Sequence, residues 1–123
     1  MRREPLLVVV FLGLLACQDV EVYQQACNGG DMLGCNELGV MYGTGEGVTQ
    51  DLARAATLYQ QACDGGEMWG CVNLGAMYGT GEGVTRDRAR AIRLYQQACD
   101  GGQKWGCTLV LGVPVEYVPP TSP

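Results

Sequence analysis

The chain has 123 residues, 47% of them hydrophobic, and this length and composition favour a single domain with a real core over a disordered chain. Its formal charge is −5, so it lacks the basic surface that binding to a phosphate backbone requires, and no nucleic-acid partner is expected. It also has no histidine, the side chain most used for acid–base catalysis near neutral pH.

The N-terminus has the pattern of a secretory signal peptide. Arg2 and Arg3 precede an apolar run from Leu6 to Ala16, which is far shorter than the roughly 20 residues that span a bilayer, so a permanent transmembrane helix is not expected. The run ends in Leu-Leu-Ala-Cys, which resembles the bacterial lipobox, where cleavage occurs before a cysteine that then carries the lipid. An ordinary signal peptide followed by a coincidental cysteine is the alternative.

The lipobox resemblance implies that residues 1–16 are the signal peptide and that Cys17 begins the mature protein as a lipidated residue. By resemblance to lipoprotein sorting in Gram-negative bacteria, Gln18 favours the outer membrane. Cleavage removes Arg2 and Arg3 and leaves the chain more acidic, so the lipid and not basic residues would hold it on a membrane. The expected location is therefore the periplasm or the outer membrane, after secretion across the bacterial inner membrane.

An internal repeat of 36 residues occupies most of the remaining chain. Residues 31–66 and 67–102 align without gaps and are identical at 27 positions, including all of MYGTGEGVT and all of LYQQACDGG. Residues 17–30 contain the lipidation site and the end of an earlier repeat, and residues 103–112 begin a third. Residues 113–123 are rich in proline, which blocks helix continuation, so we expect this tail to be extended or disordered.

Each repeat contains two segments with helical spacing of apolar residues. In the second repeat, the first helix presents one face made of Met68, Cys71, Leu74, Gly75 and Tyr78. The second helix presents one face made of Ala91, Leu94, Tyr95 and Ala98. The segment GTGEGV joins the two helices, and the repeats 31–66 and 67–102 are therefore expected to be helix pairs.

A few residues predict where the helices end and how closely they pack. Thr85 is the expected N-cap of a second helix, with Asp87 in its first turn, where a carboxylate meets the positive helix end. The pair Gly65–Gly66 supplies the left-handed conformation that ends a helix. Gly39 and Gly75 lie inside first helices at a cost of about 1 kcal/mol each, so we expect them to let a neighbouring helix approach closely.

Two-helix units of this length cannot bury their apolar faces alone, so they stack into a row of antiparallel helices. The repeated pattern LGxMYGTGEGVTxDxxxAxxLYQQAC resembles the Sel1-like repeat, a relative of the tetratricopeptide repeat, over roughly residues 20–112. The paired cysteines resemble those of the cysteine-rich, secreted branch of that family. The predicted fold class is all-α, an α-solenoid of antiparallel helix pairs in 36-residue Sel1-like repeats stapled by disulfides.

Six of the seven cysteines form three equivalent pairs, each linking the last turn of a second helix to the second turn of the next first helix. Antiparallel neighbours put these turns side by side, within the short Cα separation that a disulfide needs, whereas a bridge between distant repeats would have to cross the solenoid. The expected bonds are Cys27–Cys35, Cys63–Cys71 and Cys99–Cys107. Cys17 is left over for the lipid.

Zinc and buried free thiols are the alternatives for these cysteines. Zinc sites favour cysteines separated by two to four residues or joined by histidines, whereas the gaps here are seven residues and histidine is absent. No metal site and no other cofactor is therefore expected.

The chain shows no pattern of catalytic residues. The segment GTGEGVT follows a helix, lacks the lysine of a phosphate-binding loop and occurs once per repeat, so it is expected to be a structural connection. The only serine is Ser122, and there is no histidine to activate it. Some cysteine-rich Sel1-like proteins are described as penicillin-binding proteins or β-lactamases, and such a hydrolase is the alternative function. Because the Ser-x-x-Lys motif is absent, we expect that the protein is not an enzyme.

The remaining candidate site is the surface of the first helices opposite the core. In stacked helical repeats the first helices line the concave side, and these positions differ between the two full repeats. The candidate binding face consists of Leu33, Asn36, Glu37, Val40, Trp69, Val72, Asn73 and Ala76.

The predicted function is a lipid-anchored protein of the cell envelope that binds a protein or peptide on this face, with an exposed tryptophan as an anchor. The alternative is a structural repeat fragment without a partner, in which these positions vary because nothing constrains them. Trp69 and Trp105 would then merely pack between neighbouring first helices.

The third repeat begins a first helix that no second helix follows. We therefore expect Leu109, Val110 and Leu111 to be less buried than Leu38 and Leu74. Such an end either frays or is covered by a partner or a second copy of the chain.

Overall fold

The computed structural model describes residues 19–111. The predicted signal peptide, Cys17 and Gln18 lie outside the described residues, as do Gly112 and the proline-rich tail at 113–123. Within the described range the secondary structure is entirely helical. A helical segment at 19–28 is followed by five helices: α2 (Met32–Thr44), α3 (Leu52–Asp64), α4 (Met68–Thr80), α5 (Arg88–Asp100) and α6 (Lys104–Val110).

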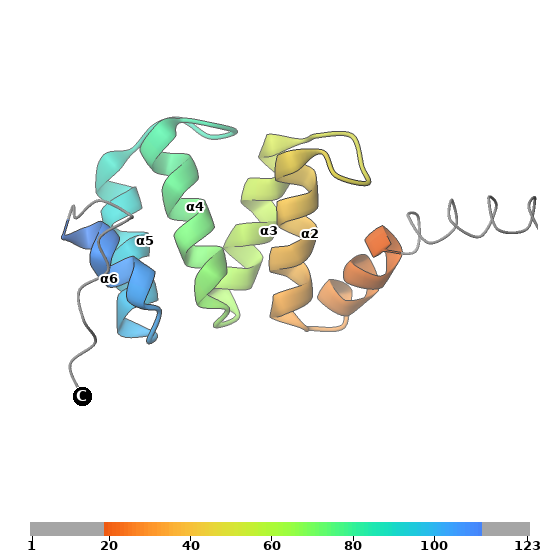
Figure 1. The fold of residues 1–123 in the computed structure, drawn as a ribbon, viewed down its shortest axis with the longest axis horizontal. Helices are drawn as coiled ribbons and strands as arrows, with labels where there is room; N and C mark the ends of the chain where they lie inside the picture. Colours follow the sequence, from red (N-terminus) through yellow and green to blue (C-terminus); the bar gives the residue numbers. More distant parts are fainter. Residues whose placement is uncertain (1–18, 112–123) are drawn as a thin grey trace, which may run out of the picture.

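Successive helices run antiparallel in a single row (Figure 1), and each packs on the next along the chain. The pair α2 and α3 falls in the first full repeat, the pair α4 and α5 in the second, and α6 begins the third. This arrangement confirms the predicted all-α solenoid of antiparallel helix pairs.

An aspartate begins the second helix of each full repeat. The Asp87 side chain accepts a hydrogen bond from the backbone N–H of Arg90 at 3.0 Å, and Asp51 is the equivalent cap of α3. The prediction of Thr85 as the N-cap is therefore wrong, and Asp87 is the cap itself and not a residue of the first turn. The reason is that the backbone N–H of Asp87 donates to the carbonyl of Tyr78 at 2.8 Å, which ties the loop to α4 and delays the helix start.

Glycine residues end the helices both at the loop within a repeat and at the turn between repeats. Gly45 and Gly81 close the first helices with φ angles of 78° and 82°. After α3 the left-handed conformation falls on Gly66, with φ of 95°, whereas Gly65 keeps φ of −86°. The pair Gly65–Gly66 thus ends α3 as predicted, with one residue in the left-handed region.

The close helix approach predicted at Gly39 is confirmed. A β-carbon built at Gly39 would lie 2.7 Å from Cε1 of Tyr59, so no larger residue fits while α3 keeps its position against α2. The aromatic ring thereby fills the place of the missing side chain and contributes to the core between the two helices.

Burial falls toward the C-terminal end of the described chain. Leu38 and Leu74 are 0% and 1% exposed, whereas Leu109 and Val110 are half-buried and Leu111 is 72% exposed. The predicted difference in burial is therefore confirmed, because α6 packs on α5 and no described helix covers its other side.

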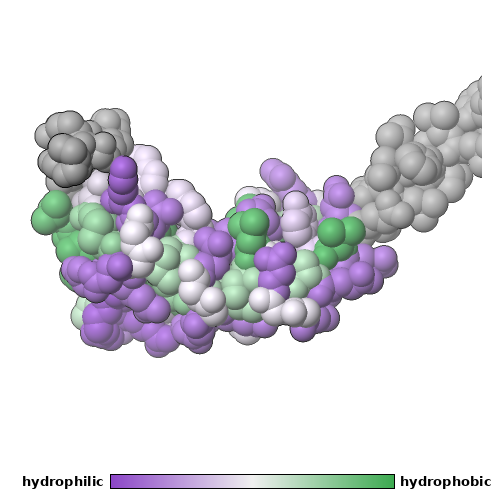
Figure 2. All heavy atoms as spheres, turned by 90° about the horizontal axis from the view of Figure 1, so that it is seen from below, coloured by the Kyte–Doolittle hydropathy of each residue, from purple (hydrophilic) through white to green (hydrophobic). Residues whose placement is uncertain are grey.

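Arginine ties each full repeat to the one before it. The guanidinium of Arg90 donates to Oε1 of Gln60 at 3.1 Å and lies over the ring of Tyr78, 4.4 Å from its centroid. The same arrangement recurs one repeat earlier around Arg54. These contacts join successive helix pairs at the protein surface. The body bends along its length (Figure 2).

Candidate binding groove

The hollowed side of the bent body is the side on which α2 and α4 lie (Figures 1 and 2). We call this side the concave face. It is the side expected to carry the binding residues, and six of the eight predicted residues are exposed or partly exposed there. These six are Leu33, Glu37, Val40, Trp69, Asn73 and Ala76.

The other two residues of the predicted face are buried, which corrects the expectation that they meet a ligand. Asn36 and Val72 occupy the same position in consecutive repeats and are only 5% and 7% exposed. The amide of Asn73 donates to the side-chain oxygen of Asn36 at 3.0 Å, and Val72 packs in the core. This position therefore lies at the seam between successive repeats instead of facing solvent.

Two hollows lie at equivalent places along the concave face. The first, of about 380 Å³, is lined mainly by Asp19, Tyr23, Glu37, Val40, Met41 and Glu46. The second, of about 240 Å³, is lined by the residues one repeat later, namely Ala55, Tyr59, Asn73, Ala76, Met77 and Glu82, together with residues of α2 and α3. The repeat thus places hollows of the same construction in front of the helical segment 19–28 and of α3.

Tyr59 forms part of the wall of the second hollow. It is only 8% exposed, and within residues 19–111 its hydroxyl has no hydrogen-bond partner. Burial raises the pKa of Tyr59 to about 12, and the negative charge of Glu37 adds to this increase. The phenol therefore stays protonated, as a donor and an acceptor, throughout the physiological range.

A third hollow lies between the starts of α4 and α6. It has a volume of about 300 Å³ and contains the side chains of Trp69 and Trp105, which are equivalent residues of consecutive repeats, with Lys104 and Thr108 beside them. Trp69 is 41% exposed, so part of its indole is open to solvent at the edge of this hollow.

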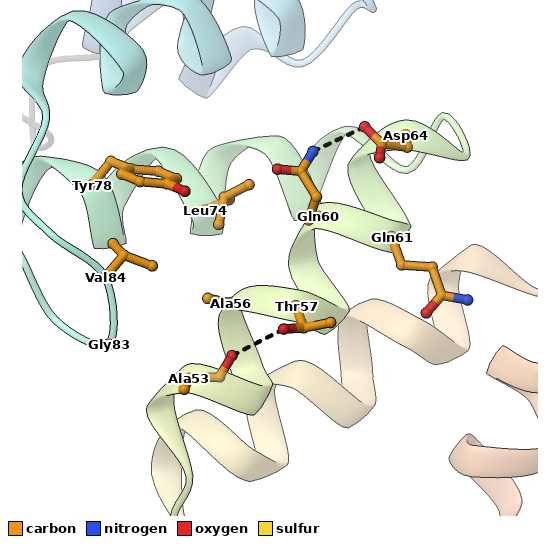
Figure 3. Close-up of a pocket in the computed structure, with 10 residues that line it drawn as sticks. All are labelled: Ala53, Ala56, Thr57, Gln60, Gln61, Asp64, Leu74, Tyr78, Gly83 and Val84. Carbon is orange, nitrogen blue, oxygen red and sulfur yellow. Dashed lines mark hydrogen bonds between the residues drawn. The ribbon is translucent and has the colours of Figure 1, made fainter.

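A larger hollow of about 540 Å³ lies on the other side of α3 (Figure 3). Its walls come from α3, from α4 and from the α4–α5 loop, with Tyr78 of α4 and Val84 of the loop opposite Ala56 of α3. None of the predicted binding residues lines it, so it is separate from the concave face.

The cysteine pairs lie at the turns that join successive repeats. The structure joins Cys27 to Cys35, Cys63 to Cys71 and Cys99 to Cys107, with Cα separations of 4.5, 4.6 and 4.6 Å. The pairing is the one expected from antiparallel neighbours, and each bond ties a second helix to the next first helix.

Two further findings concern membranes and metals. No helix of the described part is both long enough and apolar enough to cross a membrane. Within residues 19–111, no group of three carboxylate, cysteine or histidine side chains is placed to hold a metal ion.

Five residues that line the concave hollows were not predicted from the sequence: Asp19, Tyr23, Glu46, Tyr59 and Glu82. The glutamates lie in the connection that was interpreted as purely structural, and the tyrosines lie in the helix that was assigned to the core. Comparing positions 36 residues apart would have found Asp19, because its carboxylate is replaced by a methyl group at Ala55. The tyrosines and glutamates are the same in consecutive repeats, so this comparison gives no signal for them.

The Sel1 repeat pattern matches residues 33–67 and 70–103, which is more than half of the chain. The chain therefore belongs to the Sel1 repeat family, a class of helical repeat proteins. No curated protein sequence gives a significant match.

Solved structures support the same assignment. Cysteine rich protein B (hcpB) of Helicobacter pylori is 31% identical with a TM-score of 0.71, over 73% of this chain and 68% of that one. A Sel1 repeat protein from Oxalobacter formigenes is 25% identical with a TM-score of 0.71, over 76% of this chain and 37% of that one. The protein c5321, a protective antigen of uropathogenic Escherichia coli with an SLR fold, is 31% identical with a TM-score of 0.71, over 81% of this chain and 24% of that one.

Proposed function

We propose that this Sel1 repeat protein is a lipid-anchored protein of the cell envelope that binds a protein or peptide on its concave face. The observation that carries the proposal is the pair of equivalent hollows, of about 380 and 240 Å³, one repeat apart along α2 and α4. The second hollow is smaller than the roughly 300–1,000 Å³ of most small-molecule pockets, and the first lies at the lower end of that range. Small hollows in a regular series suit successive side chains of one extended polypeptide better than a single compact ligand.

The exposed residues near the starts of the first helices support the same function. Leu33 is 54% exposed and Trp69 41% exposed, and they occupy the same position in the two full repeats. A partly open tryptophan is the kind of side chain that most often supplies binding energy at protein interfaces.

Site-specific photo-crosslinking tests the binding face. A benzophenone amino acid at Ala76, which is exposed on α4 in the second hollow, is expected to form adducts with an envelope protein. The matched control is the same amino acid at Gln61, which is exposed on α3 and lines the hollow on the other side. Equal labelling from both positions, or labelling from Gln61 alone, would contradict the proposed face.

The proposed location rests on the disulfides and on the lipobox-like sequence. Three disulfides suit an oxidising compartment outside the cytoplasm. If Cys17 carries a lipid, Cys17→Ala leaves the protein unlipidated, and it no longer sediments with membranes. A variant that fractionates with membranes as the original does would contradict the lipid anchor.

A further inference from the structure

The two hollows of the concave face share a construction but differ in charge. Three residues are retained from one repeat to the next: Tyr23 and Tyr59, Met41 and Met77, and Glu46 and Glu82. Two carboxylates of the first hollow are replaced by uncharged side chains in the second, because Asp19 corresponds to Ala55 and Glu37 to Asn73. The first hollow therefore contains three carboxylates and the second only one.

No lysine or arginine is among the described residues that line the first hollow. Arg54 is the only lysine or arginine between positions 19 and 85. Its guanidinium is already engaged, since it donates to Gln24 at 3.2 Å and lies over the ring of Tyr42. The carboxylates of Asp19, Glu37 and Glu46 consequently form an uncompensated negative site.

Tyr59 adds a phenol group to the wall of the neighbouring second hollow. Its side chain is more than nine-tenths buried, but no buried side-chain polar atom of residues 19–111 lacks a partner, so its hydroxyl is reached from the open space of the hollow. Burial and, to a smaller extent, the charge of Glu37 raise the pKa of this phenol, so a carboxylate of the first hollow acts on a residue of the second. A ligand with hydrogen-bond donors would satisfy both the phenol oxygen and the carboxylates.

The shape of the first hollow indicates an organic cation. Its three acidic side chains are not placed to hold a metal ion together. Tyr23, Val40 and Met41 line the same hollow and offer apolar contacts to a methylene stem, while the carboxylates accept hydrogen bonds from the charged end. Lysine and arginine side chains combine such a stem with such an end.

We propose that the first hollow of the concave face is a subsite for a lysine or arginine side chain of the bound polypeptide. This inference rests on the proposed function and specifies the partner: an extended segment with a basic residue at the first hollow and an uncharged residue at the second. The smaller and less acidic second hollow, with Ala55, Asn73 and Ala76, sets the register of the segment.

The test uses two synthetic nonapeptides with four alanine or glycine residues on each side of a central lysine or a central glutamine. Binding to the oxidised protein is measured by NMR titration of backbone amides at low salt. We expect the lysine peptide to bind about tenfold more tightly than the glutamine peptide, which corresponds to about 1.4 kcal/mol. We also expect the largest shifts around Glu37 and Met41.

Neutralising the hollow separates local recognition from general attraction to an acidic protein. The triple variant Asp19→Asn, Glu37→Gln, Glu46→Gln is expected to lose the preference for lysine. The matched control, Glu21→Gln, Asp64→Asn, Asp100→Asn, removes as many charges at exposed positions outside both hollows and is expected to keep most of it. Conversely, Glu37→Lys is expected to favour a peptide with a central glutamate.

Three results would overturn the inference. Equal binding of both peptides to the concave face would remove the basic subsite and leave the proposed function intact. Failure of the lysine peptide to bind also contradicts the subsite, while crosslinking at Ala76 independently decides the proposed function. Self-association in analytical ultracentrifugation that disappears in the hollow variant, but not in the control, would make a second copy the occupant.

Discussion

Gly75 of α4 lies directly against the ring of Tyr95 of α5. A β-carbon at position 75 would be 2.7 Å from Cε1 of that ring and 2.9 Å from Cδ1. Gly39 and Tyr59 form the same pair in the preceding repeat. The absence of a side chain in the first helix therefore sets the distance between the two helices of a repeat.

Replacing this glycine is expected to destabilise the protein although it improves helix propensity. Gly75→Ala gains about 1 kcal/mol in propensity, but the new methyl group forces the ring of Tyr95 aside, and overpacking of this kind costs typically about 1–3 kcal/mol. We expect a net loss in the free energy of unfolding, measured by urea denaturation of the oxidised protein.

Gly79→Ala is the matched control for this prediction. Gly79 lies in the same helix, but a β-carbon there would be 3.9 Å from its nearest neighbours, which is an ordinary contact. The control is expected to stabilise the protein by up to about 1 kcal/mol. If both variants changed stability in the same direction, the ring contact would not explain the glycine.

This pair also illustrates how much of the fold is predictable from sequence. The interior glycines, the apolar spacing and the 36-residue period predict helices, their order and their close approach. The helix cap was predicted at Thr85 instead of Asp87, because the choice depends on a backbone hydrogen bond to Tyr78 that the linear pattern does not contain.

The candidate site was less predictable because it depends on how repeats turn against each other. A helical wheel places Asn36 and Val72 opposite the core, yet the adjoining repeat covers that position. The second hollow combines residues from three helices and a loop, and Tyr59 contributes to both the core and this hollow. Only the three-dimensional arrangement brings Glu37 close enough to affect that tyrosine.

Alkaline unfolding is expected to depend on Tyr59. Its pKa is about 12 in the folded protein against 10.0 for the unperturbed group, so the native state keeps the proton that the unfolded state loses. The associated stability is complete below pH 10 and falls as the pH rises from about 10 to 12. Urea unfolding across this range should show a steeper loss for the original protein than for Tyr59→Phe.

Glu37→Gln tests the second cause of this pKa shift. Because the carboxylate charge adds to the effect of burial, the variant is expected to lower the pKa of Tyr59 while leaving it above 10.0. Absorbance at the phenolate band follows the ionisation. An unchanged Tyr59 titration in the variant would show that Glu37 does not influence the phenol.

The disulfides are expected to stabilise different parts of the chain although they close loops of equal length. Chain entropy assigns about 2.5 kcal/mol to a loop of this size. Replacing Cys63 and Cys71 by alanine should lower the stability of the whole described domain, because this bond joins the two full repeats. Replacing Cys99 and Cys107 should mainly release α6.

Peptide mass mapping without reduction checks the pairing itself, and urea denaturation checks the two double variants. Linked peptides containing residues 63 and 71 are expected in the original protein. Any bond between cysteines of different pairs would contradict the local connectivity, as would equal effects of the two double variants on the main unfolding transition.

The last prediction concerns the C-terminal end of the described solenoid. Helix α6 has seven residues against 13 for α4, and Leu111 is 72% exposed at its end. Leu111 occupies the position of Gly75 one repeat earlier. In the two full repeats a glycine at this position leaves space for a tyrosine ring of the second helix. A second helix packed as α5 packs on α4 would collide with this leucine, and α6 therefore depends on α5 and on the Cys99–Cys107 bond for its stability.

Amide hydrogen exchange on the oxidised monomer measures the consequence. Amides of Gly106–Leu111 are expected to exchange much faster than those of Gly70–Gly75, because local opening of α6 exposes little buried apolar surface. The equivalent amides Gly34–Gly39 provide an internal control, since α2 has neighbours on both sides, and they should exchange slowly. Equally slow exchange at Gly106–Leu111 in a demonstrated monomer would mean that another part of the chain covers α6, and the argument from its exposed end would fail.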